Sequence, residues 1–227
     1  MPVVNAQAYA SLFTKVYTWM ALALALTGLT AYYVAGNIAI MEMLLSNSFA
    51  FWGLVAVQLG LVWGISGAIN RISFPVAGLL FVIYSILNGV TLSFIFLAYT
   101  MESIASVFFI TAGAFGGLSL VGYFIKRDLS AMGKFLLMAL IGIIIASVVN
   151  IFLQNSTLHW VVSYLGVLVF AGLTAYDTQK IKNMLVEASQ HGVTPDTQKI
   201  ALIGSLTLYL DFINLFLYLL RIFGDRR

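Results

Sequence analysis

The chain has 227 residues, of which 62% are hydrophobic and only 8% are charged. Soluble domains carry about 25% charged residues, so this composition excludes that class and predicts a polytopic helical membrane protein. The net charge of +3 forms no basic stripe that would indicate a nucleic-acid partner, and the absence of cysteine excludes disulfides and thiol catalysis.

Apolar runs of about 20 residues recur along the chain, and each is long enough to cross a bilayer as a helix. The seven predicted spans are residues 16–35, 49–69, 76–98, 104–125, 135–153, 158–176 and 200–223. They form one all-α transmembrane domain over residues 1–227. A polar N-terminal segment over residues 1–14 precedes the first span. A second polar segment, over residues 178–199, connects the sixth span to the seventh. In that connection, Thr194 and Pro195 predict a helix start with a Thr N-cap.

The basic residues set the predicted orientation. Lysines and arginines fall in alternate connections, whereas the other connections hold Glu42 and Glu102 and no basic residue. By the positive-inside rule, the N-terminus and the connection over residues 178–199 are predicted to be cytoplasmic. Seven crossings then place the C-terminus outside, although its arginines would be favoured on the cytoplasmic side. The alternative is a re-entrant last segment that returns the C-terminus to the cytoplasm.

Small residues recur every four positions in several spans. They are Gly60, Gly64 and Ala68 in the second span, Gly113 and Gly117 in the fourth, and Gly142 and Ala146 in the fifth. Such positions allow helix backbones to approach closely, so we expect them to pack inside the monomer, with dimerisation as the alternative.

Asp211 lies near the middle of the last predicted span, where a carboxylate costs a few kcal/mol and is expected to face the protein interior. Steps of three and four residues place it on one helical face with Gly204, Thr207, Asn214, Tyr218 and Arg221. A polar stripe of this kind cannot face lipid. The last helix is therefore predicted to lie at the centre of the bundle, with the other six around it.

Asp177, at the end of the sixth span, is the acidic residue best placed to be the partner of Asp211. Counting from the membrane edge places Asp211 about 16 Å deep, so the two meet only if the sixth helix dips or the seventh starts deeper. Arg71 belongs near the level of Asp177, which allows an ion pair between them.

Two carboxyl groups in a low-dielectric site cannot both ionise readily, so such a pair tends to share a proton. Protonating the partner of Arg71 would remove the ion pair, and Arg71 could thus act as a latch. Carboxylate oxygens also suit Ca²⁺, which makes Asp177 and Asp211 the predicted transient metal contacts. The predicted supporting polar core is Asn88, Thr91 and Asn214. The alternative is that the aspartates only fix the bundle.

The other polar residues form no recognised reactive site. His159 and His191 belong to no zinc or hydrolase pattern, so we expect no enzyme and no tightly bound cofactor.

Four stretches of this sequence resemble the transmembrane Bax inhibitor motif family: residues 88–93, 113–129, 172–180 and 208–216. Their most specific parts are Leu-Thr-Ala-Tyr-Asp-Thr-Gln-Lys, ending at Lys180, and Leu-Tyr-Leu-Asp-Phe-Ile-Asn, ending at Asn214. The resemblance covers nearly the whole chain and indicates a bacterial member in the cytoplasmic (inner) membrane.

This resemblance implies a seven-helix fold with the last helix central and a passive, pH-sensitive calcium leak. The family's proton-sensing aspartates match Asp177 and Asp211, and its latch arginine falls on Arg71. The long connection over residues 178–199 departs from compact bacterial members.

Two other functions stay open. Some bacterial relatives are associated with a membrane-bound AAA protease, so the chain could be a non-conducting adaptor that presents residues 1–14 to such a partner. Proton-coupled transport of a small solute also suits an intramembrane carboxylate pair, although the sequence shows no obvious inverted repeat.

Overall fold

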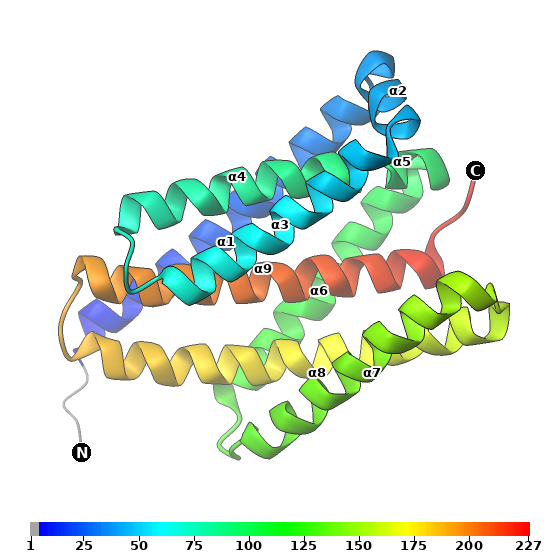
Figure 1. Ribbon diagram of the computed structural model, residues 1–227. Coiled ribbons are helices and arrows are strands. Elements are labelled where there is room, and N and C mark those ends of the chain that lie inside the picture. The colour runs from blue at the N-terminus through cyan, green and yellow to red at the C-terminus, as the bar shows by residue number, and fades with distance from the viewer. Residues whose placement is uncertain (1–4) are drawn as a thin grey trace. The chain divides into compact units, whose positions relative to one another are not determined.

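The computed structural model describes residues 5–227, which form nine helices and no β-strand (Figure 1). The helices are α1 (Ala6–Ala35), α2 (Ile38–Ser46), α3 (Ser48–Ala68), α4 (Phe74–Leu92), α5 (Ile95–Ala98), α6 (Met101–Phe124), α7 (Ser130–Leu153), α8 (Ser156–Ser189) and α9 (Pro195–Phe223). Seven helical segments, with α4 and α5 taken together, are long and apolar enough to cross a membrane. This confirms the predicted all-α membrane protein with seven spans. Of the predicted N-terminal segment 1–14, residues 1–4 lie outside the described part, and α1 begins at Ala6.

The connection between the first two spans contains a helix that the sequence analysis did not predict. Asn37 caps α2 by accepting a hydrogen bond from the backbone nitrogen of Ile40 (3.2 Å). Met41 and Leu44 are buried on one side of α2, whereas Glu42 is exposed. Residues 38–46 therefore form a short helix with one buried side.

The end of the sixth span was predicted too early. The prediction ended it at residue 176, but α8 continues to Ser189, and only residues 190–194 separate it from α9. The predicted start of the last helix is confirmed: α9 begins at Pro195, and Thr194 caps it by accepting from the backbone nitrogen of Thr197 (3.2 Å). Most of the predicted polar connection is thus helical.

The chain forms two compact units. Unit 1 contains the described part of residues 1–99, together with residues 184–209 and Arg227, and unit 2 contains residues 100–183 and 210–226. In unit 1, α4 packs against α1 and α3. The backbones of α1 and α4 approach closely at Gly89, where an added Cβ would lie 2.6 Å from the carbonyl oxygen of Thr27.

The close helix contacts do not use the predicted glycines. A Cβ added to Gly60, Gly64, Gly113, Gly117 or Gly142 would meet no described atom within 4 Å. The expectation of close packing is therefore wrong for these five glycines within their own units. In unit 2 the close approaches occur at other glycines, Gly122, Gly133, Gly166 and Gly172.

The last helix is the most enclosed of the seven spans. In its most apolar stretch 67% of the residues are buried, compared with 44% in α8 and 6% in α3. None of the six residues of the predicted polar stripe is exposed. These observations agree with the inner position predicted for α9.

Candidate functional site: a buried carboxyl pair

Asp177 of α8 and Asp211 of α9 come together inside unit 2. Their exposed fractions are 8% and 5%, and the two carboxyl groups lie close enough to interact electrostatically. Oδ2 of Asp211 is buried and has no hydrogen-bond partner among the described residues. An ionised carboxylate only accepts hydrogen bonds, so two carboxyl groups bond to each other only when one carries a proton. The arrangement therefore suits a pair that shares a proton.

The course of α8 and α9 explains how the two aspartates meet. Asp177 lies 12 residues before Ser189, the end of α8, and Asp211 lies 16 residues after Pro195, the start of α9. At 1.5 Å per residue these distances are about 18 Å and about 24 Å along the helices. Because only residues 190–194 connect them, the carboxyl groups reach similar levels. The depth mismatch expected from the sequence arose from the span boundary placed at residue 176.

Two glycines let neighbouring helices approach α8 immediately before Asp177. A Cβ on Gly122 of α6 would collide with the carbonyl group of Ala175, and a Cβ on Gly133 of α7 would collide with the ring of Tyr176. A larger residue at either position would displace α8 or the Tyr176 ring. These glycines consequently help to position the Asp177 side chain.

Gln179, two residues after Asp177, joins α8 to the connection between α6 and α7. Its Nε2 donates to the carbonyl oxygen of Arg127 (2.9 Å), and its Oε1 accepts from the backbone nitrogen of Leu129 (2.9 Å). The sequence analysis did not single out Gln179. The sequence feature that could have marked Gln179 as part of the site is its position two residues after an intramembrane aspartate.

Aromatic packing fixes the α9 side of the pair. The ring of Phe212, next to Asp211, lies 5.4 Å from the ring centroids of both Phe108 and Phe115 of α6. About two turns further on, the Tyr218 ring lies directly over Gly166 of α8. The edge-to-face contacts of Phe212 add to apolar burial, and the two rings help to hold α9 against α6 and α8.

Within unit 2, the cation that acts on Asp177 is Lys180. Lys180, one turn after Asp177 on α8, is exposed and acts electrostatically on that carboxyl group. Arg71 belongs to unit 1, where it is exposed in the connection between α3 and α4, and its backbone nitrogen donates to the carbonyl oxygen of Ala68 (2.8 Å). The Arg71–Asp177 ion pair stays a prediction.

Two of the predicted supporting residues bond elsewhere. Asn214 donates from Nδ2 to the carbonyl oxygen of Leu210 within α9 (2.8 Å). Thr91 accepts a hydrogen bond from Nε2 of Gln58, which joins α4 to α3 in unit 1. These bonds stabilise helices and helix pairs, and they do not involve the aspartates.

The third supporting residue, Asn88, belongs to a buried network centred on Tyr209 that the sequence analysis missed. Nδ2 of Asn88 donates to the Tyr209 hydroxyl (2.7 Å), and that hydroxyl also bonds to the hydroxyl of Thr27 (2.7 Å). Tyr209 is fully buried. Its signal was chemical: a tyrosine hydroxyl inside an apolar helix needs a polar partner, which α1 and α4 supply.

Tyr209→Phe is expected to destabilise the protein by about 1–3 kcal/mol, because it leaves the buried Asn88 amide without its acceptor. Thermal unfolding of the purified protein in detergent would measure the change. Tyr33→Phe removes an exposed hydroxyl from α1 and serves as the control, with an expected change below about 0.5 kcal/mol. Equal effects of the two substitutions would contradict a stabilising role for the network.

Residues 5–227 contain no group of three or more His, Asp or Glu side chains that could hold a metal ion together. The two carboxyl groups of the pair offer four oxygen atoms, whereas Ca²⁺ in proteins takes six to eight oxygen ligands. The pair alone could therefore contact a passing ion but could not enclose it.

The part of the chain that matches known proteins contains both aspartates of the pair. The family model described as "Inhibitor of apoptosis-promoting Bax1" matches residues 10–227. The chain is 53% identical over 213 residues to inner membrane protein YbhL of Escherichia coli K12, covering 94% of this chain and 91% of that relative. It is 48% identical to a protein of Borreliella burgdorferi (94% and 91% covered) and 42% identical to one of Deinococcus radiodurans (93% and 89% covered).

Proposed function

The chain belongs to the Bax inhibitor family, and from this premise we propose that it is a passive calcium leak of the inner membrane, controlled by protonation of Asp177 and Asp211. The observation that carries this proposal is the pair itself, two buried carboxyl groups that face each other between two membrane-spanning helices. The proposed orientation has the N-terminus in the cytoplasm. Water, protons and Ca²⁺ would reach the pair along the polar face of α9.

Carboxyl groups at this depth are costly, and an intramembrane pair of them marks an ion or proton pathway more often than a structural contact. Ca²⁺ is a hard cation and prefers oxygen ligands such as those of a carboxylate. Conduction also requires that an ion leave the site again, which favours few ligands over a closed cage. Because the pair offers only four oxygen atoms, it fits a brief Ca²⁺ contact.

The proposed direction of gating follows from charge. An ionised Asp177 would attract Arg71, and this contact would act as a latch on the closed leak. Acidification adds a proton to the pair and removes the charge that attracts Arg71. The latch then opens, so the leak rises as the pH falls through the mildly acidic range.

Calcium flux into dye-loaded proteoliposomes tests the proposal directly. We expect the calcium flux of the wild-type protein to rise as the pH falls from about 8 to about 5. The flux of Asp177→Asn/Asp211→Asn should not change with pH. Asp196→Asn is the matched control, because it removes an exposed carboxyl group from the start of α9 and should keep the wild-type pH response.

Absence of flux at every pH, from protein shown to be folded, would overturn the proposal. It would favour the non-conducting adaptor of a membrane-bound AAA protease. Deleting residues 1–14 would then be expected to abolish the effect on protease substrates, whereas a leak should persist in the purified protein.

A further inference from the structure

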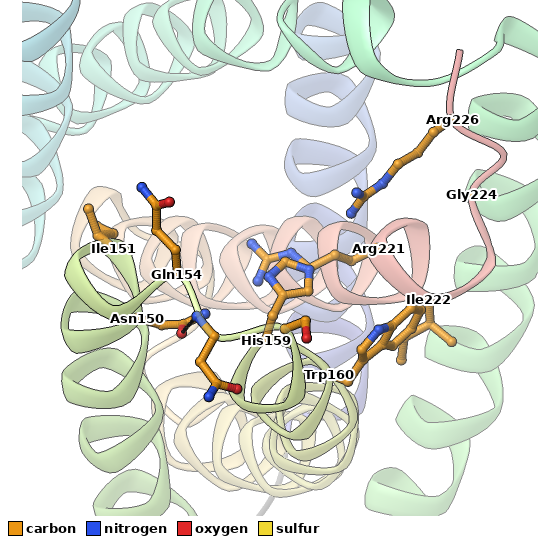
Figure 2. Close-up of a pocket in the computed structure, with 11 residues that line it drawn as sticks. Asn150, Ile151, Gln154, His159, Trp160, Arg221, Ile222, Gly224 and Arg226 are labelled. Carbon is orange, nitrogen blue, oxygen red and sulfur yellow. Dashed lines mark hydrogen bonds between the residues drawn. The ribbon is translucent and has the colours of Figure 1, made fainter.

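A cavity of about 620 Å³ lies in unit 2 where α7 and α9 end and α8 begins (Figure 2). Its lining comes from the turn between α7 and α8 and from the last residues of α9 with the tail that follows. None of the aspartates discussed above lines it. The cavity is therefore separate from the carboxyl pair and needs its own explanation.

The cavity is basic. Figure 2 shows Arg221 of α9, Arg226 of the tail and His159 of α8 on its wall. Both arginines lie close enough to His159 to act on it electrostatically. The guanidinium of Arg221 is placed by the Tyr218 ring, whose centroid lies 5.2 Å from Cζ. Within residues 100–183 and 210–226, neither arginine forms an ion pair with a carboxylate.

The cavity also holds a ring nitrogen without a partner and the start of a helix. Nε2 of His159 is buried and makes no hydrogen bond with a described residue. Asn155 caps the start of α8 by accepting from the backbone nitrogen of Leu158 (2.9 Å), and the first amides of a helix have no partner within the helix. The start of a helix also carries partial positive charge. The ligand that fits these groups is an anion with several acceptor oxygens.

The position of the cavity along the spans identifies the source of that anion. Leu153 and Phe223 are the last residues of two spans, and both are exposed, as is Phe152. Trp160, on the cavity wall, is 44% exposed and stacks on Tyr164, whose ring centroid lies 6.0 Å away. Exposed aromatic and apolar side chains at span ends are typical of the membrane interface, where lipid headgroups lie.

We infer that this cavity binds the phosphate group of an acidic phospholipid. Arg221 and Arg226 would donate to its oxygens, as guanidinium groups do in paired fashion. Trp160 and Phe223 would contact the glycerol and the first acyl carbons. The site is independent of the leak proposed above, and its test does not depend on calcium flux.

Native mass spectrometry of the full chain in detergent, titrated with phosphatidylglycerol, tests the site. Arg221→Gln/Arg226→Gln is expected to weaken binding at least about tenfold, since two charge-assisted contacts are lost. Arg227→Gln removes one positive charge next to Arg226 in sequence but outside the cavity lining, and it should change binding less than about twofold. Phosphatidylcholine should bind more weakly than phosphatidylglycerol.

Three results would overturn the inference. Unchanged lipid binding in the double variant would mean that the arginines only neutralise the ends of α7 and α9. Weakening by Arg227→Gln equal to that in the double variant would show attraction by net charge alone. Inorganic phosphate binding as tightly as the lipid would make the ligand a free anion. If the glutamine variant does not fold, Arg221→Lys/Arg226→Lys keeps the charge, loses the paired geometry and should still weaken binding about threefold.

Discussion

Replacing Asp211 with asparagine is expected to remove the pH dependence of the calcium leak and to leave the protein folded. Asn is nearly isosteric with Asp and stays neutral, so its amide can donate to Asp177 at every pH. The buried Oδ2 of Asp211 has no hydrogen-bond partner among the described residues, so the substitution removes no hydrogen bond to that atom. The ratio of leak at about pH 5.5 to leak at about pH 7.5 should fall to about one.

Proteoliposome flux and thermal unfolding, measured on the same preparations, would check this expectation. Asp196→Asn should keep the wild-type ratio, because that carboxyl group is exposed and pairs with Lys199 (3.0 Å). A leak in Asp211→Asn with unchanged pH dependence would exclude this residue as the sensor. Loss of folding in Asp211→Asn alone would instead indicate that the pair fixes the bundle.

Replacing Gly122 with alanine is expected to cost about 1–3 kcal/mol of stability and to disturb the carboxyl pair. The new Cβ would collide with the carbonyl group of Ala175, and backbone of a helix cannot move aside as a flexible side chain can. The displacement of α8 would reach Asp177, two residues further on. We therefore expect a lower unfolding temperature together with an altered pH response of the leak.

Gly117→Ala in the same helix is the matched control. A Cβ at Gly117 would meet no described atom within 4 Å. Alanine favours helix over glycine by about 0.5–1 kcal/mol, so this substitution should be neutral or stabilising. Thermal unfolding in detergent compares the two, and equal destabilisation would show that the contact at Ala175 is unimportant.

The seven spans could be predicted because each apolar run is far longer than a soluble helix needs. The error at α8 has a physical cause: hydropathy marks where a helix leaves lipid and not where the helix ends. Beyond residue 176, Ile181, Leu185 and Ala188 recur at steps of four and three and are all buried. That periodicity was present in the sequence and predicts a continuing amphipathic helix.

The carboxyl pair was predictable for a different reason. A charge at membrane depth is so unfavourable that Asp211 must face the protein, and few acidic residues could be its partner. The glycine contacts were not predictable, since spacing alone does not say which face meets another helix. Gly113 and Gly117 have the expected spacing but open surroundings, whereas Gly122 has the close contact. Tyr209 was missed because an aromatic ring counts as apolar in a hydropathy pattern.

The five-residue turn between α8 and α9 bears on the order in which the protein folds. Asp177 and Asp211 are 34 positions apart in sequence, yet only residues 190–194 between them lie outside a helix. Closing so short a loop costs little entropy, and local contacts form faster than distant ones. We therefore expect α8 and α9 to assemble as a helical hairpin whose two carboxyl groups meet early, before contacts such as that between Thr27 and Tyr209 join the first helix to the last.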